Sequence, residues 1–250
     1  MLNLWGFITG ANHETCLKIE KCTGKKVAKS YQNPNITDSI SAHADLSICH
    51  VIDNIYVCSE ESYEYYQKLI DGINLIKGKI NPHSPYPFDV AYNVLTIQKI
   101  AFLNKKYTDE ILQQQLNLAG FQLIHVAQGY AACTALAIGE NAVITADRGI
   151  AKACINIGLD VLYVESEPNI KLDSFPYGFI GGSAGGIVTE KNMIDEKYIM
   201  FTGNIYTLQN YAQILKFLEK YNCKAICLNS NVLHDVGGIL PIFSKNVLYV

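Results

Sequence analysis

The residues whose types could support catalysis first appear together in the segment SISAHADLSICHV, residues 39–51. His43 and Asp45 stand one residue apart there, in a run that is otherwise mostly apolar or small. If this segment is a β-strand, residues i and i+2 share a face, so both side chains project into the same space, about 7 Å apart at their bases. Such a pair suits general acid–base chemistry, but a buried histidine oriented by a nearby carboxylate has the same local sequence. The segment alone leaves both interpretations open.

Eight cysteines are dispersed along the chain, and no two form a Cys-x-x-Cys pair for zinc or dithiol chemistry. In a chain without a secretion signal we expect reduced thiols, most of them small buried side chains. Cys133 lies in the context GYAACT, residues 129–134. A thiolate is a strong nucleophile once a neighbouring cation lowers its pKa. Cys133 is therefore either a nucleophile or one more core thiol.

The composition is that of a globular chain of 250 residues, 49% hydrophobic and 17% charged. The net charge of −3 offers no electrostatic basis for binding nucleic acid or an anionic membrane surface. No apolar run reaches the roughly 18 residues that a membrane-spanning helix needs, and the first residues lack the basic start and apolar core of a signal peptide. We therefore expect a cytoplasmic protein that binds neither nucleic acid nor a membrane. The sequence leaves its oligomeric state open.

A repeated pattern organises the chain: a short apolar strand, a polar turn, a helix that ends near Gly or Asn, and another apolar strand. The five segments with this pattern span residues 2–33, 54–79, 99–129, 141–166 and 197–230. Apolar side chains fall mainly on one helix face, as with Ile214, Leu215 and Leu218. The residues expected to end the helices in the left-handed conformation are Gly24, Gly72, Gly120, Gly158 and Asn222.

A further strand is expected before each repeat, and each begins with a polar or glycine-rich stretch. These strands cover residues 43–51, 88–97, 129–138, 179–188 and 234–243. The last leads into residues 245–250 and joins the N-terminal repeat, which completes a fifth unit and makes the two ends of the chain neighbours. Since no single unit could bury its own apolar face and no linker divides the chain, we expect one domain over residues 1–250.

A ring of five such units resembles the pentein fold of the guanidine-modifying enzymes, which include deiminases, dimethylarginine hydrolases and amidinotransferases. His43-Ala44-Asp45 matches the His-x-Asp pair of that superfamily, and GYAACT matches its Gly-x-x-x-Cys-[Ser/Thr] context, at the same separation around the ring. The resemblance implies a five-fold pseudosymmetric α/β propeller of ββαβ-type units. The superfamily places its cysteine near the C-terminus, whereas Gly237-Gly238-Ile239-Leu240-Pro241 holds none, so the units resemble a cyclically shifted order.

The resemblance also implies a chemistry that needs no metal or organic cofactor, on a small molecule with a guanidino or amidino group. Cys133 would attack the central carbon and form a covalent thiouronium-type intermediate, in a hydrolase or transferase that acts on C–N bonds. His43 would protonate the leaving amine and later activate water. Asp45 would hold the planar cation through paired charge-assisted hydrogen bonds.

The other substrate-binding residues that the resemblance requires are incompletely matched. Asp235 lies near the place of the superfamily's Glu-Gly-Gly acid, one residue out of register. Asp89 is a second acid for the same central opening, and Ser183 is the polar residue that the glycine-rich segment GFIGGSAGG offers. Asp45, Asp235, Asp89 and Ser183 are therefore the predicted binding residues. Asp89 after a proline-rich stretch and Asp235 before two glycines are equally typical of turns.

Two other classes of function stay open. A non-catalytic pentein, like the ribosome-associated initiation factor of this fold, would bind a partner through its faces, and the shortened acidic set favours it. A metal-dependent hydrolase would use His43, Asp45, His50 and Asp53, although strand alternation points residue 50 away from 43 and 45. The segment GFIGGSAGG matches neither common phosphate-binding pattern, and we expect glycines there because backbones crowd together.

Overall fold

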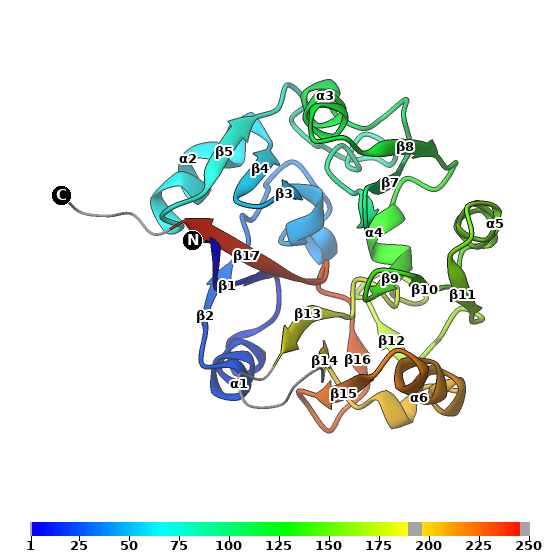
Figure 1. Ribbon diagram of the computed structural model, residues 1–250. Helices are drawn as coiled ribbons and strands as arrows, with labels where there is room; N and C mark the ends of the chain where they lie inside the picture. The colour runs from blue at the N-terminus through cyan, green and yellow to red at the C-terminus, as the bar shows by residue number, and fades with distance from the viewer. Residues whose placement is uncertain (1, 190–196, 246–250) are drawn as a thin grey trace.

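The computed structural model describes residues 2–189 and 197–245. Within these residues, five units share one connectivity, in which two antiparallel strands are followed by a helix and a third strand parallel to the second. Figure 1 shows the helices of these units around the outside of the molecule, with the strands nearer its centre. This mixed α/β architecture is the one that the repeated sequence pattern predicted.

Three units follow one another in the chain, and each forms its own three-stranded sheet. The first consists of β3 (Ile48–Ile52), β4 (Ile55–Cys58), α2 (Glu60–Leu69) and β5 (Asn74–Lys77). The second consists of β6 (Leu95–Ile97), β7 (Ile100–Leu103), α3 (Glu110–Leu118) and β8 (Gln122–His125). The third consists of β9 (Ala135–Ile138), β10 (Ala142–Thr145), α5 (Arg148–Asn156) and β11 (Asp160–Tyr163).

The other two units share a six-stranded sheet with the order β15-β14-β13-β17-β1-β2. One consists of β13 (Ala184–Thr189), β14 (Lys197–Phe201), α6 (Tyr211–Lys220) and β15 (Cys223–Cys227). The other consists of β17 (Ile239–Lys245), β1 (Leu2–Thr9), α1 (His13–Thr23) and β2 (Lys26–Lys29).

The C-terminal strand β17 completes the N-terminal unit, as predicted. It runs antiparallel to β1, from Leu2 opposite Lys245 to Thr9 opposite Ile239, so the two ends of the described chain lie side by side (Figure 1). Residues 246–250, where the sequence predicts that this strand continues, lie outside the described residues. Short elements occupy the connections: η1 (Asp38–Ile40), η2 (Ala44–Leu46), α4 (Ala131–Thr134), β12 (Ile170–Lys171), η3 (Ile205–Thr207) and β16 (Leu233–His234).

Local sequence signals set the ends of the outer helices. The side chains of Asn12, Ser59, Asp109 and Asp147 accept hydrogen bonds from backbone N–H groups in the first turns of α1, α2, α3 and α5. Each residue that was predicted to adopt the left-handed conformation after a helix has a positive φ: Gly24 (64°), Gly72 (77°), Gly120 (81°), Gly158 (84°) and Asn222 (52°). These φ values confirm the predictions. The helix ends were predictable from the sequence because capping depends on the few residues at each helix end.

The strands expected before the repeats begin later than the sequence suggested, which corrects that prediction. The ladders start at Ile48, Leu95, Ala135, Ala184 and Ile239. The polar or glycine-rich residues before them form turns and the short helix α4, in which the His43 N–H donates to the Ile40 carbonyl and the Thr134 N–H to the Tyr130 carbonyl. Their backbone groups thus form hydrogen bonds locally. The candidate catalytic side chains therefore lie on the turns and short helices that lead into the strands.

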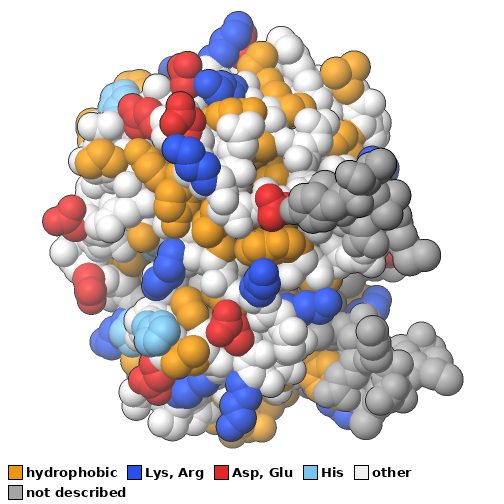
Figure 2. All heavy atoms as spheres, turned by 90° about the vertical axis from the view of Figure 1, so that its left-hand side faces the viewer, with side chains coloured by type: hydrophobic (Ala, Val, Ile, Leu, Met, Phe, Trp, Pro, Cys, Tyr) orange, Lys and Arg blue, Asp and Glu red, His pale blue; other side chains and the backbone are white. Residues whose placement is uncertain are grey.

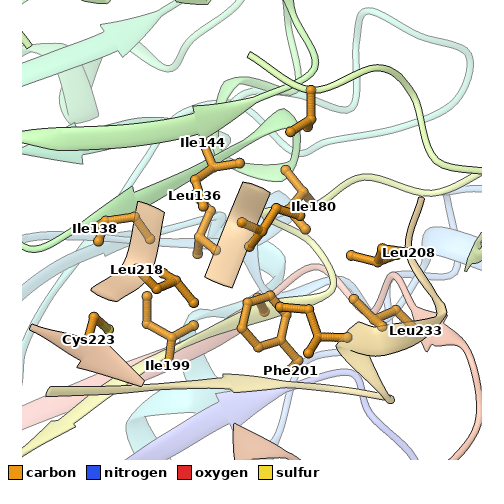
Figure 3. Close-up of a cluster of buried hydrophobic side chains, with 14 of the residues drawn as sticks. Leu136, Ile138, Ile144, Ile180, Ile199, Phe201, Leu208, Leu218, Cys223 and Leu233 are labelled. Atoms are coloured by element: carbon orange, nitrogen blue, oxygen red, sulfur yellow. The ribbon is translucent and has the colours of Figure 1, made fainter. Parts of the chain in front are cut away.

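Apolar side chains from neighbouring units pack into shared cores. Figure 3 shows one such cluster, in which Leu136 and Ile144 from the β9–β10 hairpin meet Ile199 and Phe201 of β14 and Leu218 of α6. The exposed fraction of these side chains is 6% or less. Burial between units stabilises the assembly in the way expected for units that cannot bury their apolar faces alone.

The surface carries charges of both signs. On the face drawn in Figure 2, Lys and Arg side chains lie among Asp and Glu side chains, with apolar groups between them. None of the helices in the described part of the chain has the length and apolar character needed to cross a membrane.

Glycines allow the central loops to approach one another closely. A Cβ atom on Gly181 would collide with the backbone carbonyls of the α4 segment, and one on Gly182 with the Asp235 carboxylate. A Cβ atom on Gly237, whose φ is +70°, would collide with the backbone and side chain of His43. The glycine-rich segment therefore serves close backbone packing, as the sequence predicted.

This crowding predicts that two Gly→Ala substitutions lower the free energy of unfolding by different amounts. Gly237→Ala combines a left-handed backbone with a collision at His43, whereas Gly158→Ala meets no heavy atom within 4 Å at a similar positive φ of 84°. We expect Gly158→Ala to lower the free energy of unfolding by about 1 kcal/mol. Gly237→Ala should lower it by about 2 kcal/mol more, because packed backbone must move. Urea unfolding monitored by circular dichroism measures both values, and equal losses would contradict the crowding.

Candidate active site

His43 approaches the centre of the molecule from a turn and not from a strand. It immediately precedes η2, and β3 begins only at Ile48, so the prediction that residues 43 and 45 share a strand face is wrong. The imidazole is buried, with 5% of the residue exposed. Its Nε2 atom has no hydrogen-bond partner among the described residues. An unpartnered nitrogen in a buried imidazole is available to exchange a proton with a ligand.

Cys133 lies in α4, directly before β9, and meets Asp45 across a long separation in sequence. Its Sγ atom donates a hydrogen bond to Asp45 Oδ2, with 2.6 Å between the two atoms. Reactive atoms of His43, Asp45 and Cys133 all lie within 4.8 Å of one another. The structure therefore brings together the three residues that the sequence predicted as the catalytic set.

Asn93 is a central residue that the sequence interpretation missed. Its Nδ2 atom donates to Cys133 Sγ at 3.2 Å, and its Oδ1 atom accepts from the Ala132 N–H at 2.7 Å. Asn93 is fully buried, so this side chain fixes both the thiol and the backbone beside it. The only signal in the sequence is an asparagine inside the apolar run AYNVL, residues 91–95, where a polar side chain needs partners.

Asp235 lies between β16 and β17 and is held by backbone donors. Its Oδ2 accepts from the Phe179 N–H at 2.8 Å, and its Oδ1 accepts from the Gly237 N–H at 3.1 Å. Oδ1 also lies 3.8 Å from His43 Nδ1, which is too long for a hydrogen bond but close enough for a charge interaction. The turn that the sequence suggested for Asp235 and its place beside the predicted site are therefore compatible.

The electrostatics favour neutral forms of the central groups in the free protein. Burial, reinforced by the charges of Asp45 and Asp235, raises the pKa of the Cys133 thiol well above its usual value. Burial raises the pKa of Asp45 to about 7, although the thiol hydrogen bond opposes this. Burial also lowers the pKa of His43, against the opposing effect of Asp235. At neutral pH the free site thus holds a protonated thiol beside a neutral imidazole.

The predicted binding acids have no Lys or Arg partner among the described residues. Asp45 Oδ1 and Asp89 Oδ1 are covered and lack hydrogen-bond partners among the described residues. Among the ion pairs that the described residues form, none joins Asp45, Asp89 or Asp235 to a Lys or Arg. Buried carboxylates without cationic partners are costly, and a positively charged ligand would relieve that cost.

Cavities reach the cluster from different sides. One, of about 100 Å³, is bounded by Cys133, His43 and Asp235 together with apolar side chains. A larger polar cavity of about 360 Å³ also meets His43 and Asp235, on a side where Cys133 is absent from its lining. Asp45 is half-buried and faces a third cavity of about 380 Å³. The smaller cavity is the one that gives a ligand direct access to the thiol.

Two predicted binding residues lie apart from this cluster. Asp89 is buried behind Tyr130, whose hydroxyl donates to Asp89 Oδ2 at 2.6 Å. Ser183 is fully buried, and its hydroxyl donates to the Ile180 carbonyl at 3.0 Å. Neither residue is among those that line the cavity beside Cys133. Their roles in binding stay predictions, and any contribution of Asp89 to that cavity runs through Tyr130.

The residues that could hold a metal differ from the alternative set predicted from sequence. His50 Nε2 lies 2.9 Å from the Asp53 backbone carbonyl. Within the described residues, the group with converging ligand atoms is instead His43, Asp45 and Cys133. These side chains are of the types that bind zinc, but a thiol ligand must first lose its proton.

Residues 8–240 match the model of a family of unknown function, DUF6873. The chain belongs to this family. No curated protein matches the sequence. Membership identifies the chain's relatives without assigning an activity to them.

Two enzymes are among the solved structures that match this chain. SxtG, an amidinotransferase from Microseira wollei in the saxitoxin biosynthetic pathway, matches with a TM-score of 0.51 at 14% identity, over 94% of this chain and 82% of that one. Agmatine deiminase of C. jejuni matches with a TM-score of 0.38 at 13% identity, over 70% of this chain and 60% of that one. The first likeness extends over nearly the whole chain and confirms, at the level of fold, the predicted resemblance to the guanidine-modifying enzymes.

The raised pKa of Asp45 predicts a pH-dependent effect of Asp45→Asn on stability. Between about 3.8 and about 7 the folded chain keeps a proton on Asp45 that the unfolded chain has released, so this carboxyl makes the folded state less stable as pH rises. Relative to the parent, Asp45→Asn should therefore gain stability across that window, by at most about 4 kcal/mol, and then level off.

Chemical denaturation at a series of pH values measures this difference. Asp71→Asn, which neutralises an exposed carboxylate, is the matched control. A stability difference between Asp45→Asn and the parent that stays flat from acid to neutral pH would contradict the raised pKa.

Proposed function

We propose that this chain is a cysteine-dependent enzyme of the pentein superfamily that acts on a C–N bond of a small guanidino or amidino compound. In this proposal residues 1–250 form one domain, and the five observed units correspond to a five-fold pseudosymmetric propeller. The enzyme works in the cytoplasm, as a hydrolase or a transferase, with a small-molecule substrate. Cys133, His43 and Asp45 are its catalytic residues, and Asp45 and Asp235 bind the substrate cation.

One observation carries the proposal: a buried thiol, an unpartnered imidazole nitrogen and buried carboxylates converge where the described residues supply no Lys or Arg partner. A planar cation with several N–H donors fits this arrangement, because each carboxylate oxygen can accept a charge-assisted hydrogen bond. A guanidinium or amidinium group also has an electrophilic carbon for the thiol to attack. The fold likeness to an amidinotransferase supports the same class of substrate.

The bound cation would also activate the nucleophile. Burial is the main cause of the raised pKa of the Cys133 thiol, and the charges of Asp45 and Asp235 add to it; a positive charge beside the two carboxylates would offset their part and make the thiolate more accessible in the complex. The Cys133 proton would pass to His43 Nε2, which lacks a partner in the free site. Asp235, 3.8 Å from Nδ1, would stabilise the imidazolium that forms.

The first half-reaction then follows from these positions. The Cys133 thiolate attacks the central carbon and forms a C–S bond, and His43 returns its proton to the departing nitrogen as the C–N bond breaks. An amine leaves, and a thiouronium-type intermediate stays on Cys133. In the second half-reaction His43 deprotonates a water or an acceptor amine, which attacks the same carbon. The C–S bond breaks and releases the product and the Cys133 thiolate, and the proton that His43 took up passes to the sulfur, which restores the thiol and the neutral imidazole.

The remaining predicted residues take supporting roles in this proposal. Asn93 holds the thiol and the α4 backbone. Asp89 orients Tyr130 at the cavity wall through the hydrogen bond between them. Ser183 fixes the glycine-rich loop through its bond to Ile180, from where it would position Asp235 and not touch the substrate. The proposed steps use no metal or organic cofactor.

Alkylation by 2-chloroacetamidine tests the proposal, with neutral 2-chloroacetamide as its isostere. At pH 7.5 we expect the amidinium reagent to label Cys133 at least about tenfold faster than the neutral one, because only the cation offsets Asp45 and Asp235. The exposed thiols of Cys22 and Cys227 serve as internal controls and should show no such preference. Peptide mass spectrometry measures each rate on one sample.

His43→Ala should lower the rate of amidinium labelling at Cys133, because His43 would accept the thiol proton, whereas His125→Ala, at an exposed histidine on β8, should leave that rate unchanged. Equal rates for the two reagents at Cys133, or an amidinium labelling rate indifferent to His43→Ala, would overturn the enzymatic proposal. Such a result would favour the non-catalytic binding protein that the sequence left open.

A further inference from the structure

The cavity beside Cys133 has a polar base and an apolar wall. Cys133, His43 and Asp235 form the base. The rest of the lining consists of Ile40, Tyr130, Leu172, Phe175, Tyr177 and Phe179. A cavity of about 100 Å³ exceeds by several-fold the roughly 10–15 Å³ that one water requires, so it admits a group of several non-hydrogen atoms. Pockets with apolar walls and a few convergent polar groups are typical small-molecule sites.

Aromatic side chains continue from this cavity toward the surface. The Tyr130 ring lies 5.2 Å from Tyr86 and 6.3 Å from Phe179, and Phe179 lies 6.1 Å from Tyr177, between ring centroids. At the outer end, 44% of Phe175, 37% of Tyr177 and 49% of Tyr86 are exposed. Large aromatic groups that stay in contact with water beside a buried thiol leave apolar surface for a ligand to cover.

The charged residues around this cavity limit which charged groups a bound substrate can have. Among the described residues that line it there is no Lys or Arg. Lys171 lines the neighbouring polar cavity instead, together with the acids Glu14, Asp38 and Asp173. A carboxylate on the substrate would therefore lose its hydration beside aromatic rings without gaining a cationic partner, and it would also face Asp235.

A second positive charge on the substrate would also lack a partner. Asp235 is the carboxylate that lines this cavity, and the reacting cation uses it. Asp89 is enclosed behind Tyr130 and does not face the cavity. The aromatic wall thus has no further acid to pair with a distal ammonium group, whereas an uncharged ring or alkyl chain needs none.

We propose that the substrate is an amidine or guanidine with an uncharged apolar substituent, aryl or alkyl, and not an amino acid or a diamine derivative. The amidinium group lies at Cys133 and Asp235, with Asp45 in contact with the thiol from outside the cavity lining, and the substituent packs along Phe175, Tyr177 and Phe179. This inference rests on the proposed function of the same site. It adds the chemical class of the group that determines specificity.

A series of N-substituted 2-chloroacetamidines tests this selectivity: the unsubstituted compound and its N-benzyl, N-(3-carboxypropyl) and N-(3-aminopropyl) derivatives. Each alkylates a thiol by forming an S–C bond while chloride leaves. Rates at Cys133 are divided by rates at exposed Cys227 in the same sample, which removes differences in intrinsic reactivity. We expect the N-benzyl compound to exceed the unsubstituted one by about tenfold, and both charged derivatives to fall below it.

The aromatic wall is tested by the ratio of the N-benzyl rate to the unsubstituted rate. Phe175→Ala and Tyr177→Ala should each lower this ratio by about fivefold, because each removes a ring that the benzyl group would contact. Tyr206→Ala is the matched control, since Tyr206 is 62% exposed and does not line this cavity. The ratio compares two reagents on one variant, so a general loss of folding does not imitate the expected change.

The outcomes separate this inference from the proposed function. If unsubstituted 2-chloroacetamidine prefers Cys133 but the benzyl derivative gains nothing, or a charged derivative reacts as fast, the proposed function stands and the substrate class is wrong. If the unsubstituted amidinium reagent shows no preference over 2-chloroacetamide, both are overturned.

Discussion

The short contact between the Cys133 thiol and the Asp45 carboxylate is the interaction around which the centre of this protein is arranged. The two residues are 88 positions apart in sequence, yet their Sγ and Oδ2 atoms lie 2.6 Å apart. Asn93 supports the thiol from a third segment, and Asp235 approaches His43 from a fourth. A buried thiol is acidic or inert according to the charges around it, so these few side chains decide whether the centre is reactive.

The arrangement leaves negative charge uncompensated at the site, and this explains why the free and bound states should differ. Burial raises the pKa values of both Cys133 and Asp45, so the free site favours neutral groups and a protonated, weakly nucleophilic thiol. In the proposed mechanism a cationic substrate would reverse that balance, because it would pair with the carboxylates and stabilise the thiolate. The same acids would then restrict reactivity to ligands that carry a positive charge.

Close backbone packing makes this geometry attainable. Gly182 and Gly237 lie where any side chain would displace Asp235 or His43, and Gly181 lies against the segment that carries Cys133. Antiparallel pairing of β1 with β17 joins the two ends of the chain, so that the unit containing Gly237 stands beside the turn containing His43. The likeness in fold to an amidinotransferase at 14% identity is consistent with an architecture that tolerates extensive sequence change.

The amino-acid sequence by itself determined the features that depend on neighbours along the chain. Helix ends at Gly24, Gly120 and Gly158, the repeated units, and the His43-x-Asp45 and Cys133 motifs were all predictable, because capping and periodicity are local. The starts of the strands were not predictable in this way, since the backbone groups of residues such as His43 form hydrogen bonds within turns and not within strands. Only the tertiary structure decided that Asn93 holds the thiol, that Asp235 reaches His43 while Asp89 stays behind Tyr130, and that aromatic rings line the cavity. Those outcomes depend on how loops from separate units meet, and no short stretch of sequence encodes such a meeting.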